Sequence, residues 1–496
     1  MCGIAGVRNH PNASAMVAVM LEALQHRGHD GAGIASSDGE SIHEKKGLGY
    51  VKDVFKYVRF ETDLPGSMAI GMNRYATTGD ARSVQNIHPF HVWKPLDGGV
   101  EKIAVVHNGN IINYESLKAE MIEQGTVFSK TSDTEIVLHL IDRSQENTFG
   151  DIIRDACSQL QGAYSLLFLG TKSFFAVTDP HLFRPLVMGR IDEDTYVFAS
   201  EICAFTALDA AGYGPVGDIV ELGGGEMVSF FHSSGILREA QVPPMRSCHC
   251  TFEHVYLASQ HSTLFGMPIS VVQKELGRSL AQQDFDEHGK ALVMPDIVIG
   301  VPDSGCSIAQ WYTAEYVSMF GNTYGRYPNI LYVSDAVMRN PAINRTFIAM
   351  DQKTREELLK KKFIVNAELI NGKSILLIDD SIVRSSTMKI LIPQLRKAGA
   401  REIHVRSGSP EIIEKCDFGI NISNRDELIA AQFSIDEICV MLDIDSLKYN
   451  SINALLHAVG DPQNARSCTT CFSGTPPDTD SFALKLKLPM LPPSPA

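Results

Sequence analysis

The sequence lacks long apolar runs and has little basic charge. Among its 496 residues, no uninterrupted apolar stretch reaches the roughly 18 residues that a membrane-spanning helix needs. Lysine and arginine number 44 against 58 aspartates and glutamates, which gives a formal net charge of −14. An acidic surface of this kind repels nucleic acids and anionic lipids. We therefore expect no nucleic acid and no membrane as partners, while a local basic pocket for one small phosphorylated substrate is still allowed.

The first residues do not have the pattern of a secretion signal, and cysteines are few. Met1 and Cys2 are followed by Gly-Ile-Ala-Gly-Val, without the basic segment and long apolar stretch of a secretory signal, so we expect a cytoplasmic protein. The 10 cysteines are too few for a disulfide scaffold. In a reducing compartment, catalysis or metal ligation is the better reason for cysteines that cluster, as Cys468 and Cys471 do.

The first half of the chain has the pattern of a layered sheet structure, and the length allows two or more domains. Between residues 2 and 240, short apolar and β-branched runs separated by turn residues predict strands, with helices over residues 15–26 and 132–144. Blocks of strands with few helices between them favour an α+β domain of stacked antiparallel sheets with helices packed outside.

The second half has a different pattern. Apolar strands at 296–301, 374–378 and 402–407 alternate with helices at 308–319 and 387–397. This alternation indicates an α/β domain with a parallel sheet, which we expect to span residues 250–472. Residues 473–496 are rich in proline and show no period, so we expect a disordered tail there.

Cys2 stands where removal of Met1 would leave a free α-amine and a thiol on one residue. A terminal residue that carries both a nucleophile and a base is one known solution for acyl transfer. Its position alone also fits a small buried cysteine.

Three downstream motifs could complete such a site, and each also has a plainer explanation. Arg74 is suited to grip a carboxylate, or is an exposed arginine at a strand end. Asn108 and Gly109 can donate N–H groups to an oxyanion, or form a hairpin turn. Asp133 can bind an amine, although the segment 132–135 (Ser-Asp-Thr-Glu) also has the form of a helix capping box.

These residues together supply what the hydrolysis of the side-chain amide of free glutamine needs. The first half resembles the class II glutamine amidotransferases, whose N-terminal-nucleophile hydrolase domain begins with Cys-Gly-Ile, and the resemblance continues through residues 26–30, 179–186 and 199–201. The roles that it implies are a nucleophile at Cys2, a grip on glutamine by Arg74 and Asp133, and an oxyanion hole formed by Asn108 and Gly109.

In the second half, Asp379 and Asp380 follow a buried strand. Ligands of open α/β folds bind at this edge of the sheet, and adjacent acids can bind ribose hydroxyls or Mg²⁺. The following loop leads into a helix N-terminus, where the hydroxyls of Ser385, Ser386 and Thr387 can hold a phosphate. A capped helix with acids in its preceding loop is the plainer alternative.

This segment resembles the phosphoribosyl pyrophosphate signature of the type I phosphoribosyltransferases. Residues 301–305 resemble that family's pyrophosphate loop, and residues 345–348 with Lys362 resemble its mobile loop. The resemblance implies Mg²⁺ ligation by Ser304, Asp379 and Asp380. The whole phosphoribosyl pyrophosphate site that it implies comprises Asp303, Ser304, Arg345, Lys362, Asp379, Asp380, Ser381, Arg384, Ser385, Ser386 and Thr387.

The two halves in this order resemble the family of glutamine phosphoribosylpyrophosphate amidotransferases over residues 2 to about 474. The resemblance implies transfer of the glutamine amide nitrogen to phosphoribosyl pyrophosphate, which gives 5-phosphoribosylamine, glutamate and pyrophosphate and opens purine synthesis. It also implies a channel for ammonia between two sites, inhibition by purine nucleotides, and a homo-oligomer, which is a tetramer in that family.

Cys468 and Cys471 have a two-residue spacing that fits metal ligation, redox chemistry or neither. The cluster-bearing branch of the same family supplies two partners, Cys250 and Cys416, and four thiolates make a 4Fe–4S site. Cys248 competes with Cys250 for the fourth position. Four unrelated buried cysteines are the alternative.

The sequence departs from the family pattern at three places near the expected sites, one of which is Gly71-Met72-Asn73, before Arg74, where the family has Gly-His-Val. Ser385 replaces the usual glycine, where a side chain could crowd the phosphate or add a hydrogen bond. Ser259 lies in Ala-Ser-Gln-His-Ser, where the family has Ala-Arg-Pro-Asp-Ser. Two alternatives stay open on this basis: a diverged paralogue that aminates another phosphorylated sugar, and a non-catalytic regulator that binds phosphoribosyl pyrophosphate or nucleotides.

Overall fold

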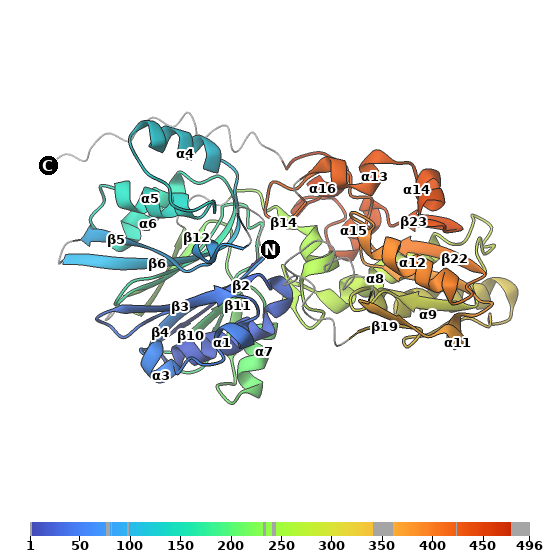
Figure 1. Cartoon of the computed structure of the whole chain (residues 1–496), viewed down its shortest axis with the longest axis horizontal. Helices are drawn as coiled ribbons and strands as arrows, with labels where there is room; N and C mark the ends of the chain where they lie inside the picture. The colour runs from blue at the N-terminus through green and yellow to red at the C-terminus, as the bar shows by residue number, and fades with distance from the viewer. Residues whose placement is uncertain are drawn as a thin grey trace.

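A computed structural model describes residues 2–75, 80, 82–96, 99–231, 235–240, 245–340, 361–422 and 424–477. The chain forms two halves that lie side by side, with the N-terminal half on the left of Figure 1 and the C-terminal half on the right. None of the described helices combines the length and the apolar character that a bilayer crossing requires.

Two antiparallel sheets build the N-terminal half. The first has seven strands, in the order β11 (Gly217–Glu221), β9 (Val187–Arg190), β10 (Tyr196–Ala199), β1 (Gly3–Arg8), β4 (Met68–Arg74), β2 (Gly31–Ser37) and β3 (Ile42–Leu48). The second has six, in the order β13 (Gly235–Ala240), β12 (Glu226–Phe231), β8 (Phe174–Thr178), β7 (Gly162–Leu169), β6 (Gly99–Ile111) and β5 (Phe90–Leu96).

The two sheets pack face to face. Ile4 and Ile70 of the first sheet share one buried core with Val106 and Leu167 of the second. On the outer faces, α1 (Ala13–Ala23) and α7 (Cys203–Ala210) cover the first sheet, and α5 (Glu135–Arg143) and α6 (Phe149–Ser158) cover the second. The predicted stack of antiparallel sheets between helices is therefore confirmed.

The helices of this half are more numerous than the sequence pattern suggested. The predicted stretches 15–26 and 132–144 correspond to α1 with the short 3-10 turn Gln25–Arg27, and to α5. The segment α6 was missed, although its buried residues Phe149, Ile152, Ile153 and Ala156 recur at helical spacing. The remaining helices are α2 (Val51–Val54), α3 (Phe60–Asp63), α4 (Tyr114–Glu123), α7 and the 3-10 turn Val84–Asn86.

A five-stranded parallel sheet forms the centre of the C-terminal half, as predicted. Its order is β18 (Leu331–Tyr332), β17 (Ile297–Gly300), β21 (Ser374–Asp379), β22 (Glu402–Ser407) and β23 (Ser446–Tyr449). Every residue of β21 is buried, because helices cover both faces of the sheet.

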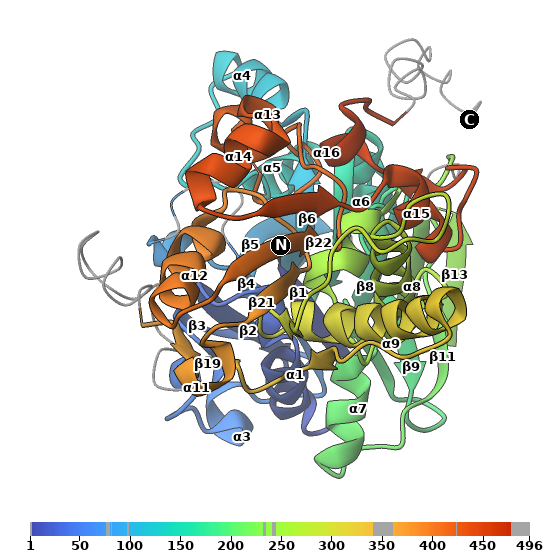
Figure 2. The same ribbon diagram turned by 90° about the vertical axis from the view of Figure 1, so that its right-hand side faces the viewer.

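Helices lie on both sides of this sheet (Figure 2). On one face are α8 (Ile269–Gln282) and α9 (Gly305–Tyr324), and on the other α12 (Ser386–Lys397) and α14 (Ile435–Leu442). The predicted helices 308–319 and 387–397 are thus confirmed, and Gly399, with a φ of +91°, follows the end of α12 as expected.

Short elements complete this half. They are β14 (His249–Cys250), β15 (Thr263–Leu264), β16 (Met267–Pro268), β19 (Val337–Arg339), β20 (Phe363–Val365), β24 (Ser467–Cys468), α11 (Ala367–Ile370), α13 (Ile429–Gln432), α15 (Ile452–Ala458), α16 (Thr470–Ser473), the π-helical turn Glu253–Leu257 and the 3-10 turn Arg425–Glu427. Residues 478–496, most of the predicted disordered tail, lie outside the described residues.

A buried ion pair ties the parallel sheet to the helices on one face. Arg406 of β22 donates two hydrogen bonds of 2.8 Å to the carboxylate of Asp284, and both side chains are 0% exposed. Lys448 lies 2.9 Å from the same carboxylate, and the Tyr312 hydroxyl donates to it at 2.6 Å. Burial alone would raise the pKa of Asp284, but the hydrogen bonds and charge of Arg406 hold it below its usual value.

We predict that Asp284→Asn lowers the free energy of unfolding by about 3–5 kcal/mol, because it leaves a buried arginine without its counter-charge. Urea denaturation followed by circular dichroism would measure the change. Glu287→Gln is the control: its side chain is 86% exposed, and a change within about 0.5 kcal/mol is expected there. Equal stability of the two variants would contradict the prediction.

The same carboxylate predicts a pH dependence. Since the pKa of Asp284 is lower in the folded chain than in the unfolded one, its stabilising contribution is complete above the unfolded value of about 3.9 and is lost as the pH falls through the folded value. The difference in stability between the wild type and Asp284→Asn should therefore shrink below about pH 4.

Candidate active sites

Cys2 lies where the two sheets of the N-terminal half meet. Its backbone N–H donates to Asn108 Oδ1 of β6 at 3.3 Å, and its Sγ lies 3.7 Å from the carbonyl oxygen of Tyr75, just after β4. The next residue, Gly3, donates to Asn73 Oδ1 at 2.8 Å. The thiol is thus fixed between β4 in one sheet and β6 in the other.

Asn108 and Gly109 lie inside the long strand β6, opposite Ser165 and Tyr164 of β7. The alternative of a hairpin turn is therefore wrong. The Asn108 side chain is buried, and within the described part of the chain its Nδ2 has no hydrogen-bond partner. Gly109 has a φ of +153°, and a Cβ there would lie 1.9 Å from the Ala163 oxygen. Asn108 therefore presents an unused N–H donor beside Cys2.

Arg74 is the last residue of β4 and is buried, so the alternative of an exposed arginine at a strand end is wrong. Its Nη1 donates to the Asp80 carbonyl at 3.0 Å. Asp133 is also buried, and its Oδ2 accepts the Ile111 N–H at 2.9 Å, which ties it to the end of β6. The structure thus brings both proposed glutamine grips to the strands that hold Cys2 and Asn108.

The capping box expected over residues 132–135 does not form. The Ser132 hydroxyl donates to Asp133 at 3.4 Å, and α5 begins at Glu135 without a side-chain cap from Thr134. The Glu135 carboxylate instead accepts the backbone N–H groups of the preceding loop, from Lys130 at 2.7 Å and Ser129 at 2.8 Å. Glu135 therefore satisfies the loop just before its helix and does not close a capping box.

In the C-terminal half, two neighbouring strand ends bring acids and hydroxyls together. Asp379 ends β21, and Ser304 precedes α9 after β17, the strand beside β21. The Ser304 hydroxyl contacts Asp380, and the Ser381 hydroxyl donates to Asp380 at 2.7 Å. Burial raises the pKa of Asp379 and of Asp380, and the charge of Asp380 adds to the rise at Asp379. Such a set of oxygens fits a hard divalent cation.

The loop before α12 has the backbone that a phosphate loop requires. Ser385 has a φ of +54°, in the left-handed region that favours glycine, and its hydroxyl donates to the Arg384 carbonyl at 2.7 Å. The Arg384 guanidinium points toward Glu427, at 2.5 Å. Ser386 and Thr387 form the first turn of α12, where backbone N–H groups are open to an anion.

Two further residues were expected to bind phosphoribosyl pyrophosphate. Arg345 lies outside the described residues, whereas Lys362 follows that gap. Burial and the neighbouring charge of Arg339 lower the pKa of Lys362, and Asp379 partly offsets this effect. Arg339, which donates to Asp303 at 2.6 Å, was not expected from the sequence. It follows no motif, so only the tertiary structure reveals it.

The four predicted cluster cysteines come together. Cys250 in β14 is the direct strand partner of Cys468 in β24, and the pKa of Cys471 is raised by burial and by Cys416, Cys250 and Cys468. All four are free thiols. Cys248 is buried in one cluster with Cys468, against which Cys416 packs, and its sulfur lies 3.9 Å from Nδ1 of His181. The choice of Cys250 over Cys248 therefore stays a prediction, which the pairing of Cys250 with Cys468 supports.

No three sulfur atoms of the four predicted cluster cysteines lie within 4.8 Å of one another in the described structure. A zinc ion with bonds of about 2.3 Å would need all four sulfurs closer together than this.

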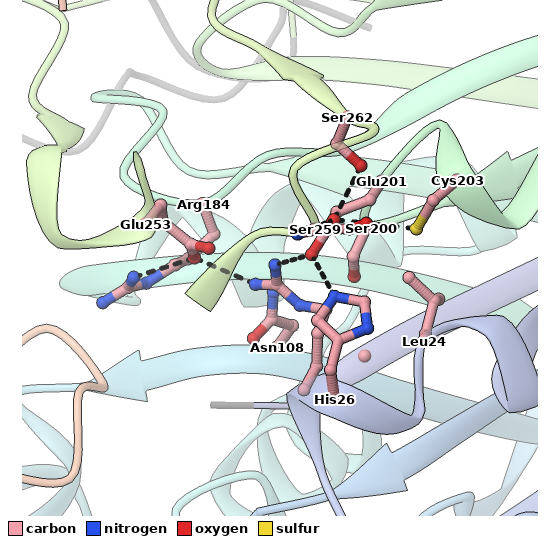
Figure 3. A network of polar contacts seen from close by, with 12 residues as sticks. Leu24, His26, Asn108, Arg184, Ser200, Glu201, Cys203, Glu253, Ser259 and Ser262 are labelled. Atoms are coloured by element: carbon pink, nitrogen blue, oxygen red, sulfur yellow. Dashed lines mark hydrogen bonds and ion pairs between the residues drawn. The ribbon is translucent and has the colours of Figure 1, made fainter. Parts of the chain in front are cut away.

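A network of buried charges joins the two halves beside Cys2 (Figure 3). Arg27 donates from Nε to the Cys2 carbonyl at 3.1 Å, and from its terminal nitrogens to Glu201 at 2.5 Å and Glu253 at 2.9 Å. Arg184 donates to the same Glu253 oxygen at 3.1 Å. These four charged side chains are 0% exposed. None of them had a role expected from the sequence, although three of the four lie in segments 26–30, 179–186 and 199–201, which resemble the glutamine amidotransferases.

One group of side chains in this network has the spacing of a metal site. Atoms of His26, Glu201 and Cys203 lie within 4.8 Å of one another. However, the Glu201 carboxylate already accepts hydrogen bonds from Arg27 and from Ser262, and burial raises the pKa of the Cys203 thiol to about 12. An arginine-paired carboxylate and a protonated thiol are poor ligands, so this group is better explained as part of the network.

Comparison with known proteins gives consistent matches. A family model described as a glutamine amidotransferase domain matches residues 83–207. An amidophosphoribosyltransferase (chloroplastic) of Vigna aconitifolia is 36% identical over 476 residues, which cover 96% of this chain and 91% of the relative. An amidophosphoribosyltransferase of Methanocaldococcus jannaschii is 35% identical over 494 residues, 97% of this chain and 98% of the relative.

Two solved structures match nearly the whole chain. The glutamine phosphoribosylpyrophosphate amidotransferase of B. subtilis, complexed with ADP and GMP, has a TM-score of 0.82 at 34% identity and covers 96% of this chain and 97% of that one. A structure described as the allosteric regulatory enzyme of purine biosynthesis has a TM-score of 0.84 at 33% identity and covers 96% of each chain. With such identity over almost its full length, the chain belongs to the amidophosphoribosyltransferase family.

Proposed function

We propose that this protein transfers the amide nitrogen of glutamine to phosphoribosyl pyrophosphate, forming 5-phosphoribosylamine, glutamate and pyrophosphate in the first step of purine synthesis. The observation that carries the proposal is the unused N–H donor of Asn108, buried beside Cys2. An unsatisfied buried donor is costly unless it serves a ligand. Here the donor belongs to the same side chain whose oxygen accepts the backbone N–H of Cys2, the residue that would attack an amide.

At the first site, Arg74 binds the α-carboxylate of glutamine and Asp133 its ammonium group. Once Met1 has been removed, the α-amine of Cys2 takes the thiol proton as sulfur attacks the amide carbon. Asn108 Nδ2 and the Gly109 N–H stabilise the oxyanion. The proton passes to the leaving nitrogen, ammonia departs, and water hydrolyses the thioester to release glutamate and restore the thiol.

At the second site, Ser381, Ser386 and Thr387 with the backbone N–H groups at the start of α12 bind the 5′-phosphate. Arg384 and Ser385 complete this loop. Asp379 and Asp380 bind the ribose hydroxyls. The pyrophosphate is held by Asp303 and Ser304, which follow β17, and by Arg345 and Lys362.

Ser304, Asp379 and Asp380 are the residues that would hold Mg²⁺. The bound ion would neutralise charge on the departing pyrophosphate. Ammonia attacks C1 of the sugar as pyrophosphate leaves.

Ammonia must travel between the two sites without meeting water. We propose a channel between the two halves for this transfer, as the resemblance to the glutamine phosphoribosylpyrophosphate amidotransferases implies.

The remaining assignments are proposals of the same kind. Residues 2–240 form the glutaminase domain, residues 250–472 the phosphoribosyltransferase domain, and Cys250, Cys416, Cys468 and Cys471 bind a 4Fe–4S cluster of structural or oxygen-sensing role. The protein is cytoplasmic, assembles as a homo-oligomer, by resemblance a tetramer, and is inhibited by purine nucleotides. The B. subtilis relative solved with ADP and GMP supports the last point.

We predict that Cys2→Ala reduces glutamine-dependent formation of pyrophosphate by at least about 10³-fold and leaves the ammonia-dependent reaction intact, because only the first site uses the thiol. Cys439→Ala, in α14, is the matched control and should retain both activities. Loss of both activities in Cys2→Ala would show that the sites are not separable. Intact mass should show that Met1 is absent from the active protein.

Replacing both Asp379 and Asp380 with asparagine should reduce pyrophosphate release by about 10²–10³-fold with either nitrogen donor, because the charges that bind ribose and Mg²⁺ are gone. Asp436→Asn, an exposed acid in the first turn of α14, should have no effect. Undiminished pyrophosphate release by the double variant would remove these residues from the site.

Protein purified without oxygen should be brown and contain about four irons and four sulfides per chain. Cys416→Ser should lower both the iron content and the thermal stability, because the cluster would tie β14 to residues more than 200 positions later. Cys248→Ser is the matched control and should change neither. If Cys248→Ser behaves like Cys416→Ser, the ligand set is wrong; colourless and active anaerobic protein would refute the cluster.

A further inference from the structure

Glu253 is a fully buried carboxylate of the C-terminal half that contacts the N-terminal half. It begins the π-helical turn Glu253–Leu257, three residues after Cys250. Its Oε1 accepts hydrogen bonds from Arg27 at 2.9 Å and from Arg184 at 3.1 Å. Its Oε2 is buried and has no partner in the described structure. One oxygen atom therefore holds two arginines. These arginines bond to different parts of the proposed glutamine site.

The first arginine, Arg27, bonds to Cys2, the proposed nucleophile. Arg27 Nε donates to the carbonyl oxygen of Cys2 at 3.1 Å. The next residue, Gly28, packs so closely on the end of β4 that a Cβ there would lie 2.5 Å from the Arg74 carbonyl carbon. Little freedom is left to this segment, so the guanidinium of Arg27 sets the position of the Cys2 backbone from which the thiol projects.

The second arginine, Arg184, holds a loop that packs on β6. We call β6 the oxyanion strand, because it carries Asn108 and Gly109. Arg184 donates from Nε to the Phe418 carbonyl at 3.1 Å, and its Nη2 contacts the same oxygen. The neighbours of Phe418 lie against β6. Asp417 accepts a 2.8 Å hydrogen bond from Asn110 Nδ2, and a Cβ on Gly419 would lie 2.9 Å from the carbonyl carbon of Gly109. Arg184 thus holds the loop of residues 417–419, which packs against Gly109.

We propose that Glu253 is a positioning residue for glutamine hydrolysis, which sets the nucleophile through Arg27 and the oxyanion donors through Arg184. The inference rests on the proposed function of Cys2. It means that the geometry of the glutaminase site is completed by a residue of the other half. Glutamine itself is held by Arg74 and Asp133, and Glu253 is bonded to neither.

This separation predicts which kinetic constant changes. Misplacing a nucleophile or an oxyanion donor slows the chemical step, whereas the grips on the α-carboxylate and the ammonium group set the binding of glutamine. Loss of the Glu253 charge should therefore lower kcat for glutamate release and leave KM for glutamine unchanged.

Glu253→Gln tests the proposal, because the new side chain keeps one carbonyl oxygen and nearly the same shape but carries no charge. We expect kcat for glutamate release to fall by about 10–100-fold, with KM within about twofold. Ammonia-dependent pyrophosphate release by the same preparation should be unchanged, which also shows that the chain is folded. Wild-type kcat in this variant would overturn the proposal.

Glu221→Gln is the matched control. Glu221 is another carboxylate that crosses between the halves, since it accepts the backbone N–H groups of Phe265 at 2.6 Å and Gly266 at 3.1 Å. It has no arginine among these partners and no link to Cys2. Its replacement should leave both reactions unchanged. An equal loss of kcat in Glu221→Gln would show that any weakening of the interface suffices, which would also overturn the proposal.

A second variant covers the case in which Glu253→Gln fails to fold, seen as loss of the ammonia-dependent reaction. Asn110→Ala removes the 2.8 Å contact with Asp417 without leaving a buried charge, and it should lower kcat several-fold at constant KM. Unchanged kcat in Asn110→Ala would then overturn the proposal. Cys2→Ala is assayed in parallel: if it still releases glutamate, the proposed function of Cys2 fails, and that result is distinct from the others.

Discussion

The balance of buried charge between the two halves is the constraint on which the rest of the arrangement depends. Arg27, Arg184 and Glu201 belong to the N-terminal half, and Glu253 to the other. Without Glu253, the buried Arg27 and Arg184 would lose the carboxylate that accepts hydrogen bonds from both, and an uncompensated buried charge costs several kcal/mol. Docking of the halves supplies the missing carboxylate. Because Arg27 also bonds the carbonyl of Cys2, docking of the halves and the position of the Cys2 backbone are linked.

The cysteine group is connected to this balance through Arg184. Burial raises the pKa of Cys250, and the charge of Arg184 partly opposes the rise. The thiols must lose their protons to bind metal, so a nearby cation favours the bound state. Because the same guanidinium also holds the Phe418 carbonyl, the segment from Cys416 to Gly419 runs from the cysteine group to the oxyanion strand. The cysteine group and the oxyanion strand look independent in the sequence, but Arg184 interacts with the first and holds the loop that packs on the second.

Periodicity predicted the architecture, and local motifs together with the family resemblance supplied the proposed residues of both sites. The strands of both halves are apolar runs with little ambiguity, and Asn108 and Asp379 each follow such a run. Local patterns failed in two places. The Asn-Gly pair lies inside β6 because β7 pairs with it across the whole motif, and Glu135 bonds the loop just before it instead of forming a capping box. The charged network was not predictable, because Arg27 and Glu253 are 226 positions apart and no motif joins them.

The structure also explains how the chain accommodates its departure from the family at Ser385. A residue with a φ of +54° is strained unless it is glycine, at a cost of about 1–3 kcal/mol. The serine hydroxyl donates to the carbonyl of Arg384, the preceding residue, so the side chain is used within the loop. The backbone keeps the left-handed turn that starts α12, and the N–H groups of Ser386 and Thr387 stay at the helix N-terminus. What the loop requires is therefore the turn, which a serine can adopt at a local energetic cost, and the substitution does not by itself argue for another substrate.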